Sequence, residues 1–193
     1  MSRPERTSVS PPSDQARVLV VDDEEAVTDP YRLRLDAEYD VDVATGGREA
    51  LATVDDSHDV VLLDRRMPEI SGDEVLEEIC SRGLDCKVVM VTAIDPDFDI
   101  LEMKCDDYIV KPIEDGQLHE VVDRVLRIAE YSDRRQELGA KKLKRNVLEV
   151  EMRDKELQDS EEYQRLEAEI SEVEEEVDEL EDELGLENVD RFM

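Results

Sequence analysis

The chain has 193 residues and a formal net charge of -31, with 55 acidic residues against 24 basic ones. This length provides one domain of typical size and an appendage. The acidic excess opposes generic binding to nucleic acids and anionic membranes and is typical of proteins that work in concentrated salt. No apolar stretch approaches the roughly 20 residues that span a bilayer. The start of the chain also lacks the apolar core of a signal peptide, so the sequence predicts a cytoplasmic, halophilic protein.

The first two thirds of the chain alternate between strand and helix patterns. Residues 1–15 contain Pro4, Pro11 and Pro12 and predict a disordered lead-in. Between residues 16 and 130, apolar runs predict strands at 17–21, 41–44, 59–63, 86–91 and 107–110, with helices near 25–37, 47–55, 72–81, 97–103 and 115–130. Five successive βα units predict a parallel sheet covered by helices on both faces.

After Tyr131 the pattern becomes helical only. Residues 133–153 form one amphipathic pattern, with an apolar stripe at Ala140, Leu143, Val147 and Val150. We expect Leu143, Val147 and Val150 to pack against the apolar stripe of the helix that follows, within one chain or across a dimer. Asp159 and Glu162 predict the N-terminal cap of a second helix that extends to Leu184. Its apolar residues alternate in steps of three and four: Tyr163, Leu166, Ile170, Val173, Val177, Leu180 and Leu184. The phase of the pattern changes between Leu157 and Tyr163, where we expect the break between the helices.

Two arrangements of these helices fit the sequence, an intramolecular hairpin and a dimeric coiled coil. Residues 131–155 hold 8 basic and 5 acidic residues, whereas residues 156–190 hold 1 basic and 17 acidic residues. Folding back places the acidic helix against Arg134, Lys141, Lys142 and Arg145, which favours the hairpin. Concentrated salt screens this preference, so a homodimer through the Leu/Val stripe remains an alternative.

Polar residues follow four of the predicted strands, at the end where each strand finishes. They are Asp22 and Asp23, Asp64, Thr92 and Lys111. Because the carboxyl ends of parallel strands meet at one edge of a sheet, where open α/β sheets bind ligands, we expect these side chains to lie together.

The residue types at this edge suit a metal ion and a phosphoryl group. Asp22, Asp23 and Asp64 offer hard oxygen ligands of the kind that Mg²⁺ prefers. Lys111 supplies a cation and Thr92 a hydroxyl, so a carboxylate could attack phosphorus here with its charge compensated. Each aspartate alone has a simpler interpretation, since acidic residues often begin helices. Their shared position at strand ends favours a site.

Other candidate groups have structural interpretations. His58 and His119 have no partner at catalytic or metal-binding spacing, which predicts solvated surface positions. Cys80, Cys86 and Cys105 match no zinc or disulfide pattern and predict reduced structural residues. The basic cluster at residues 141–145 predicts a solvated or paired helix face, with DNA contact as the alternative.

The motifs VLVVDDEE, VVLLDRRMP, MVTA and DDYIVKP, in this order and spacing, resemble the receiver domains of two-component response regulators over residues 16–130. The resemblance implies a flavodoxin-like, doubly wound, five-stranded parallel sheet. It implies that Asp64 accepts a phosphoryl group from a sensor histidine kinase, and that Asp22, Asp23, Asp64 and the backbone carbonyl of Arg66 bind Mg²⁺. Thr92 and Lys111 would contact the phosphoryl group. Thr92 and Tyr108 would act as the switch, although Tyr108 also fits plain strand packing.

Residues 131–190 resemble the HalX-type segment that follows receivers in haloarchaea, through the stretches KKLKRNVLE and SEEYQRLE. The sequence therefore predicts a phosphoacceptor signalling protein, not an enzyme in the ordinary sense, with a helical C-terminal module and an unidentified output partner. The alternative is a transcriptional regulator that binds DNA through the basic helix of that module.

Overall fold

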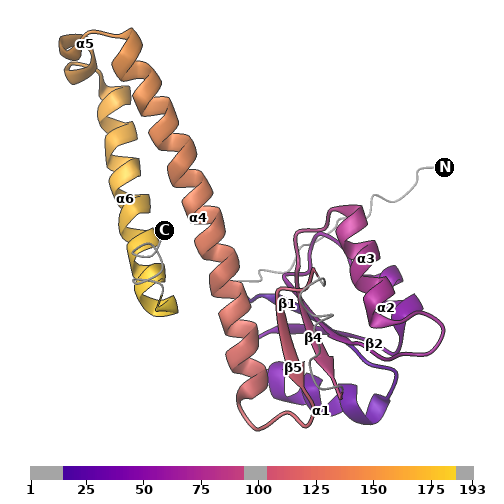
Figure 1. The fold of residues 1–193 in the computed structure, drawn as a ribbon. Helices are drawn as coiled ribbons and strands as arrows, with labels where there is room; N and C mark the ends of the chain where they lie inside the picture. Colours follow the sequence, from indigo (N-terminus) through magenta and orange to yellow (C-terminus); the bar gives the residue numbers. More distant parts are fainter. Residues whose placement is uncertain (1–14, 94–103, 186–193) are drawn as a thin grey trace, which may run out of the picture. The chain divides into compact units, whose positions relative to one another are not determined.

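The computed structural model describes residues 15–93 and 104–185. Five strands form one sheet in the order β2-β1-β3-β4-β5, and every neighbouring pair is parallel (Figure 1). The strands are β1 (Arg17–Val21), β2 (Asp40–Ala44), β3 (Val60–Asp64), β4 (Lys87–Thr92) and β5 (Asp107–Val110). The predicted fold class is confirmed, and each predicted strand is present within one residue at either end.

Apolar runs place the central strands in the core. All residues of β3 are buried, as expected for a strand covered on both faces. Helices α2 (Gly47–Thr53) and α3 (Gly72–Arg82) contact each other and pack on one face of the sheet. On the other face lie the alternate residues Val18, Val20 and Leu62, all nearly inaccessible to solvent. Helix α1 (Glu25–Leu35) contacts β1 and β2.

The predicted lead-in at 1–15 and the predicted helix at 97–103 lie almost wholly outside the described residues. The contacts divide the chain into two compact units, residues 1–120 and 121–193. The predicted division into 1–15, 16–130 and 131–190 stays a prediction. In the described part of the chain no helix is long and apolar enough to cross a membrane. The cytoplasmic location also stays a prediction.

Helix α4 is longer than the sequence suggested. It extends from Gln117 to Glu151 without interruption, so the two helices predicted at 115–130 and 133–153 are one. The residues at this point are Tyr131, Ser132 and Asp133. None of them is a glycine or a proline and all three tolerate helical geometry, so helical hydrogen bonding continues. The amino-acid composition changes after Tyr131, but the helix does not end there.

Two further helices complete the second unit. The short α5 (Asp154–Gln158) follows α4, and α6 (Glu161–Leu184) begins with Ser160 as its N-cap, which accepts a hydrogen bond from the backbone N–H of Tyr163. The cap predicted at Asp159 was one residue early. The interruption between α5 and α6 lies inside the interval predicted from the phase change. Helix α6 ends at Gly185, whose φ of 67° is in the left-handed region.

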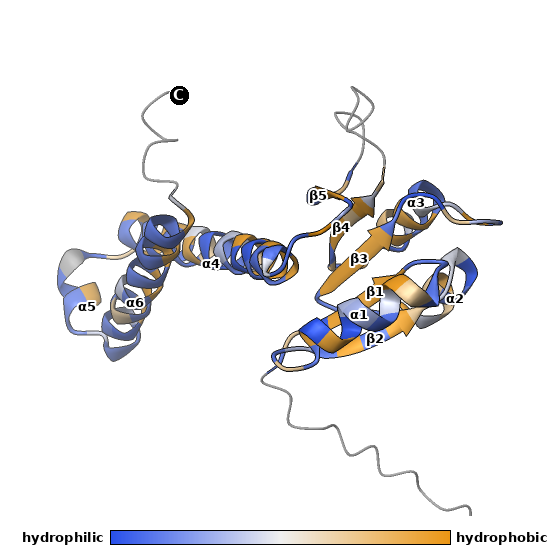
Figure 2. Cartoon of the chain, turned by 90° about the horizontal axis from the view of Figure 1, so that it is seen from below, coloured by the Kyte–Doolittle hydropathy of each residue, from blue (hydrophilic) through white to orange (hydrophobic). Residues whose placement is uncertain are grey.

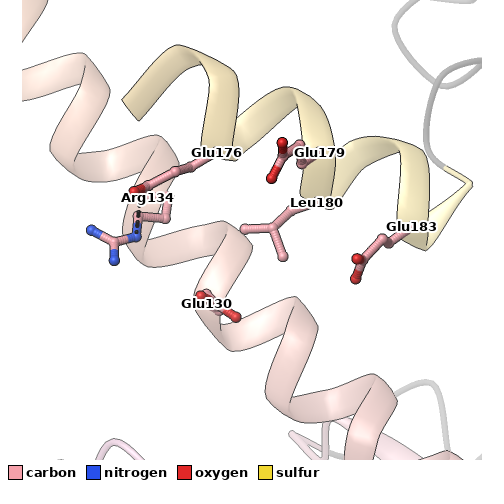
Figure 3. Close-up of a pocket in the computed structure, with 6 residues that line it drawn as sticks. All are labelled: Glu130, Arg134, Glu176, Glu179, Leu180 and Glu183. Atoms are coloured by element: carbon pink, nitrogen blue, oxygen red, sulfur yellow. Dashed lines mark ion pairs between the residues drawn. The ribbon is translucent and has the colours of Figure 1, made fainter. Parts of the chain in front are cut away.

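Helices α4 and α6 form an antiparallel hairpin within one chain, as the charge argument favoured. Cross-helix ion pairs join basic residues of α4 to glutamates of α6 along its length: Arg127–Glu183, Arg134–Glu176, Lys142–Glu174, Lys141–Glu169 and Arg145–Glu167. Figure 3 shows one end of this interface, where Leu180 points toward α4 beside the pair of Arg134 and Glu176.

The apolar stripe of α6 is buried as predicted, at Ile170, Val173, Val177 and Leu180. The expectation that α4 packs against α6 through Leu143, Val147 and Val150 was wrong. These side chains are 65%, 54% and 81% exposed. The opposite, basic side of α4 faces α6, because its long side chains pair with the glutamates of α6.

Candidate functional site

Four strands deliver their polar ends to one edge of the sheet. Strands β1, β3, β4 and β5 are neighbours in this order, and all are parallel. Asp22 therefore follows β1 next to Asp64 at the end of β3, and Thr92 ends β4 beside Val110 of β5. The backbone N–H of Lys111 donates to the carbonyl of Thr92 at 2.8 Å. Asp22, Asp64 and Thr92 are buried although polar.

Lys111 joins two of the predicted site aspartates. Its Nζ lies 2.5 Å from Oδ2 of Asp22 and 2.6 Å from Oδ1 of Asp64. The other oxygen of each carboxylate accepts a backbone hydrogen bond, from Glu24 at 2.9 Å and from Arg66 at 2.7 Å. A single cation thus compensates two buried negative charges, and backbone donors fix the orientation of both carboxylates.

Burial dominates the electrostatics of the phosphoacceptor candidate. It raises the pKa of Asp64 above its usual range, although hydrogen bonding to Lys111 and the charge of Lys111 act in the opposite direction. For Lys111, burial alone would lower the pKa. The hydrogen bonds that Lys111 donates to Asp22 and Asp64, together with the charges of these carboxylates, outweigh burial and leave the pKa of Lys111 raised. Asp64 is therefore a carboxylate whose charge is costly to keep, which suits a group that reacts or binds cations.

The loop between β3 and α3 leaves no room for a side chain at Gly72. A Cβ there would lie 2.2 Å from the carbonyl oxygen of Asp64 and 2.9 Å from Cα of Arg65. The N–H of Gly72 donates to the carbonyl of Arg65 at 3.0 Å, and the Arg65 side chain pairs with Asp73 at 3.2 Å. Ser71 and Glu74 form a capping box at the start of α3. These contacts hold the backbone on which Asp64 is carried.

The remaining predicted site residues are placed as follows. Asp23 is exposed, next to the buried Asp22. Arg66 is exposed, and its backbone borders Asp64. Tyr108 is partly buried and packs against the core cluster under α2 and α3. Asp22, Asp64 and Lys111 are thus brought into direct contact, with Thr92 bonded to the backbone of Lys111.

Sequence reasoning missed three features of this region. Neither the close approach of the backbone at Gly72 nor the pair Arg65–Asp73 follows from a sequence pattern. The third is Tyr31 on α1, whose pKa is raised mainly by burial and also responds to the charges of Lys111, Asp22 and Asp64. Tyr31 therefore lies in the electric field of the site. Its position nine residues after Asp22, in the middle of α1, gave no signal in the sequence.

The donor types fit a magnesium ion. The carboxylates of Asp22 and Asp64 and the carbonyl of Arg66 are hard oxygen ligands, and the two carboxylates already converge on one positive charge. Within residues 15–93 and 104–185, no group of three or more His, Cys, Asp or Glu side chains is arranged to hold a metal. Asp23 would have to turn inward to become a further ligand.

His58 was expected on the surface, but it is buried, with Nε2 3.2 Å from Asp42 and Nδ1 3.2 Å from Asp55. The two carboxylates, which sequence spacing alone did not connect, explain its burial. His119 is partly buried beside Glu38. The three cysteines are free, as expected, and burial raises the pKa of the Cys86 thiol to about 11, consistent with an unreactive residue.

Comparison with known proteins identifies the family. The model of the response regulator receiver domain matches residues 18–123, and that of the HalX domain matches residues 127–192. A protein of Haloferax volcanii named "Putative transcriptional regulator" is 52% identical over 126 residues, covering 63% of this chain and 22% of that protein. The alkaline phosphatase synthesis transcriptional regulatory protein PhoP of Bacillus subtilis is 34% identical over 121 residues, covering 60% and 50%.

Solved structures agree. A CheY-like receiver domain protein from Methanospirillum hungatei superposes with a TM-score of 0.56 at 29% identity, covering 60% of this chain and 97% of that one. The response regulator TrrA of Thermotoga maritima, solved in complex with Mg²⁺ and BeF, has a TM-score of 0.51 at 34% identity, covering 57% and 99%.

The chain belongs to the response regulator receiver family and is a response regulator of two-component signalling, with a HalX domain following the receiver. A haloarchaeal relative accords with the acidic composition. The chain spans less than two thirds of the length of the curated relatives described above, so their activities as whole proteins do not transfer directly to it.

Proposed function

We propose that Asp64 accepts a phosphoryl group from a sensor histidine kinase and that the chain thereby switches contacts with an output partner. The observation that carries this proposal is the convergence of Asp64, Asp22 and Lys111 at one sheet edge, with the Asp64 carboxylate oriented by the N–H of Arg66. A carboxylate oxygen of Asp64 attacks phosphorus, and the bond from phosphorus to the donor's leaving group breaks.

The chain's own groups assist this transfer. Lys111 neutralises charge on the incoming phosphoryl oxygens, and the hydroxyl of Thr92 donates to one of them. Asp22, Asp23, Asp64 and the carbonyl of Arg66 would hold Mg²⁺. When bound, the ion would supply further positive charge to compensate the phosphoryl group. In this proposal the protein assists its own phosphorylation and dephosphorylation, and the kinase supplies the donor.

The test is phosphorylation by acetyl phosphate with mass spectrometry on the intact protein. We expect one added phosphoryl group on the wild type in the presence of Mg²⁺ and none after chelation by EDTA. Asp64→Asn should abolish labelling. Asp56→Asn, a matched change at an exposed aspartate of the same unit, should leave labelling unchanged. Labelling of Asp64→Asn at the wild-type level would refute the proposal.

The proposed switch involves Thr92 and Tyr108. A new dianion on Asp64 would draw the Thr92 side chain toward it, and the Tyr108 ring would move into the space left behind. Tyr108 is suited to this because it is only partly buried on β5, an edge strand of the sheet. Thr92→Ala should still accept the phosphoryl group but lose the phosphorylation-dependent change in hydrogen exchange around β5. An equal change in both proteins would contradict the switch.

A DNA-binding function is the second candidate, because relatives such as PhoP are named as transcriptional regulatory proteins. The hairpin argues against it, since Lys141, Lys142 and Arg145 already pair with glutamates of α6. A salt series with duplex DNA separates the two functions, because phosphate contacts weaken steeply as salt rises. Tight, salt-sensitive binding would favour the DNA-binding function.

A further inference from the structure

One side of α4 carries no charged residue over more than five helical turns. Its members are spaced by three or four residues and include Ser132, Gln136, Ala140, Leu143, Val147 and Val150, which we call the charge-free face. In a chain in which 41% of residues are charged, this surface is unusual. All six residues are exposed, and the three large apolar ones are more than half exposed.

The charge-free face is not the face that holds the hairpin together. Arg134, Lys141 and Arg145 pair with α6, and at 100° per residue they project from the opposite side of α4. Hydropathy colouring shows apolar positions in α4 as well as in the strands (Figure 2). Leu143, Val147 and Val150 thus form an exposed apolar stripe on α4, in addition to the buried stripe of α6. The other side of α4 already packs against α6 within the chain.

We propose that the charge-free face binds the same face of a second copy of this chain, with the two α4 helices parallel and in register. A net charge of -31 makes two copies repel each other over most of their surface. On the charge-free face this repulsion is smallest. A second copy also keeps its acidic α6 on the far side of its own α4, away from the contact.

Charge along the borders selects the parallel arrangement. One border of the face carries Glu137, Lys144 and Glu151, whereas the other carries the uncharged Gly139 and Asn146. In a parallel pair each charged border meets the uncharged border of the partner helix, so like charges do not oppose each other along the borders. An antiparallel pair with Leu143 over Ala140 would place Val150 against Asp133. The parallel pair places uncharged like residues in every layer from Gln136 to Val150, and Asp133 faces its own copy only in the layer beyond Gln136.

The residues in the layers also match a two-stranded assembly. Gln136, Ala140, Leu143, Val147 and Val150 alternate in steps of four and three, the spacing of a heptad seam. In this phase the β-branched Val147 and the γ-branched Leu143 take the positions at which such residues favour dimers over larger assemblies. Two copies, and not three or four, are therefore expected.

The test is sedimentation equilibrium of the full chain at molar salt, without Mg²⁺ or a phosphoryl donor, so that its result is independent of phosphorylation. The wild type should show a reversible monomer–dimer equilibrium. Val147→Asp should weaken it at least tenfold without loss of helical signal, because this side chain is 54% exposed within one chain. Leu33→Asp, at a side chain on α1 that is 78% exposed, should leave it unchanged.

The parallel arrangement is tested by crosslinking. Leu143→Cys, in a background with the exposed Cys80 replaced by Ser, should form an intermolecular disulfide under mild oxidation, whereas Leu33→Cys should not. A wild type that stays monomeric at all concentrations overturns the proposal. So does a dimer unaffected by Val147→Asp. A dimer sensitive to Val147→Asp in which position 143 does not crosslink overturns the parallel register.

Discussion

Each unit of this protein holds a lysine between two carboxylates, and the two lysines have different surroundings. In the receiver, Nζ of Lys111 lies 2.5 Å from Asp22 and 2.6 Å from Asp64. In the hairpin, Nζ of Lys141 lies 2.5 Å from Glu169 and 3.5 Å from Glu137. The lysine side chains are similarly buried, at 20% and 18% exposed. The difference between the two clusters lies in the carboxylates.

The side chains of Asp22 and Asp64 are 4% and 9% exposed, whereas those of Glu137 and Glu169 are 40% and 43% exposed. Burial raises the pKa of Asp64 in spite of its lysine. The hydrogen bond from Lys141 lowers the pKa of Glu169. In the hairpin, the lysine thus favours the charged form of the carboxylate. In the receiver, burial disfavours the charged form of Asp64 more than the lysine favours it. The exposure of the acid, and not the geometry of the lysine, separates the two clusters.

The largest effect is expected where the hairpin depends on apolar burial and not on its ion pairs. Replacing Val173 and Val177 together by Asp puts two charges into the buried stripe of α6, at a cost of several kcal/mol each. The hairpin should unfold while the receiver remains folded, and far-ultraviolet circular dichroism in high salt would record the lost helix. Asp at the exposed positions Ala168 and Ser171 is the matched control and should leave the signal intact. Unchanged helicity in the first variant would mean that the stripe does not hold the helices.

The next effect compares the two lysines directly. Lys111→Gln leaves two buried carboxylates without their cation and should reduce the free energy of unfolding of the receiver by about 3 kcal/mol. Lys141→Gln should have little effect, because solvent screens its partners. Urea denaturation measures both. Added Mg²⁺ should restore part of the loss in Lys111→Gln alone, since the ion can replace the missing positive charge. Equal losses in both variants would remove the distinction drawn between the clusters.

The site and the sheet could be predicted because they follow from local patterns. Apolar runs such as residues 60–63 specify buried parallel strands, and the parallel rule then brings Asp22, Asp64 and Lys111 to one edge without any knowledge of contacts. The spacing of α6 likewise identified Ile170 and Val173 as buried. These inferences needed only periodicity and the direction of the chain.

Features that depend on which surfaces meet could not be read from periodicity. Leu143 and Val147 formed the better apolar stripe of α4, but α6 selected the basic side because seventeen acidic residues follow in the chain. His58 is buried because strand β2 supplies Asp42, sixteen residues away. Gly72 lies against the backbone of Asp64 only once α3 has packed. Tertiary partners decide such positions, and one sequence does not list them.

A smaller difference in stability between the two units is expected when one glycine of each is replaced by alanine. Gly72→Ala forces a Cβ against the Asp64 carbonyl and should destabilise the receiver by about 1–3 kcal/mol while slowing phosphorylation. Gly139→Ala, in the interior of α4 with nothing within 4 Å of its Cβ, should stabilise the hairpin by about 0.5–1 kcal/mol. Thermal unfolding of dilute protein measures both changes. A stabilising Gly72→Ala would show that the loop can yield without moving Asp64.

The smallest effect concerns pH, and its sign differs between the units. The folded pKa of Glu169 is lowered, so its contribution to stability is present above its ordinary value of 4.5 and is lost as the pH falls through the folded pKa. The folded pKa of Asp64 is raised above 3.8, mainly by burial. Its ionisation therefore reduces stability at neutral pH, and this penalty disappears as the pH falls through the raised pKa toward 3.8. As the pH falls from 7 to 3.5, the free energy of unfolding of the wild type relative to that of Glu169→Gln should decrease. Relative to that of Asp64→Asn, it should increase. Urea titrations of the three proteins at several pH values would measure both differences, and a common sign would show that burial does not control the ionisation of Asp64.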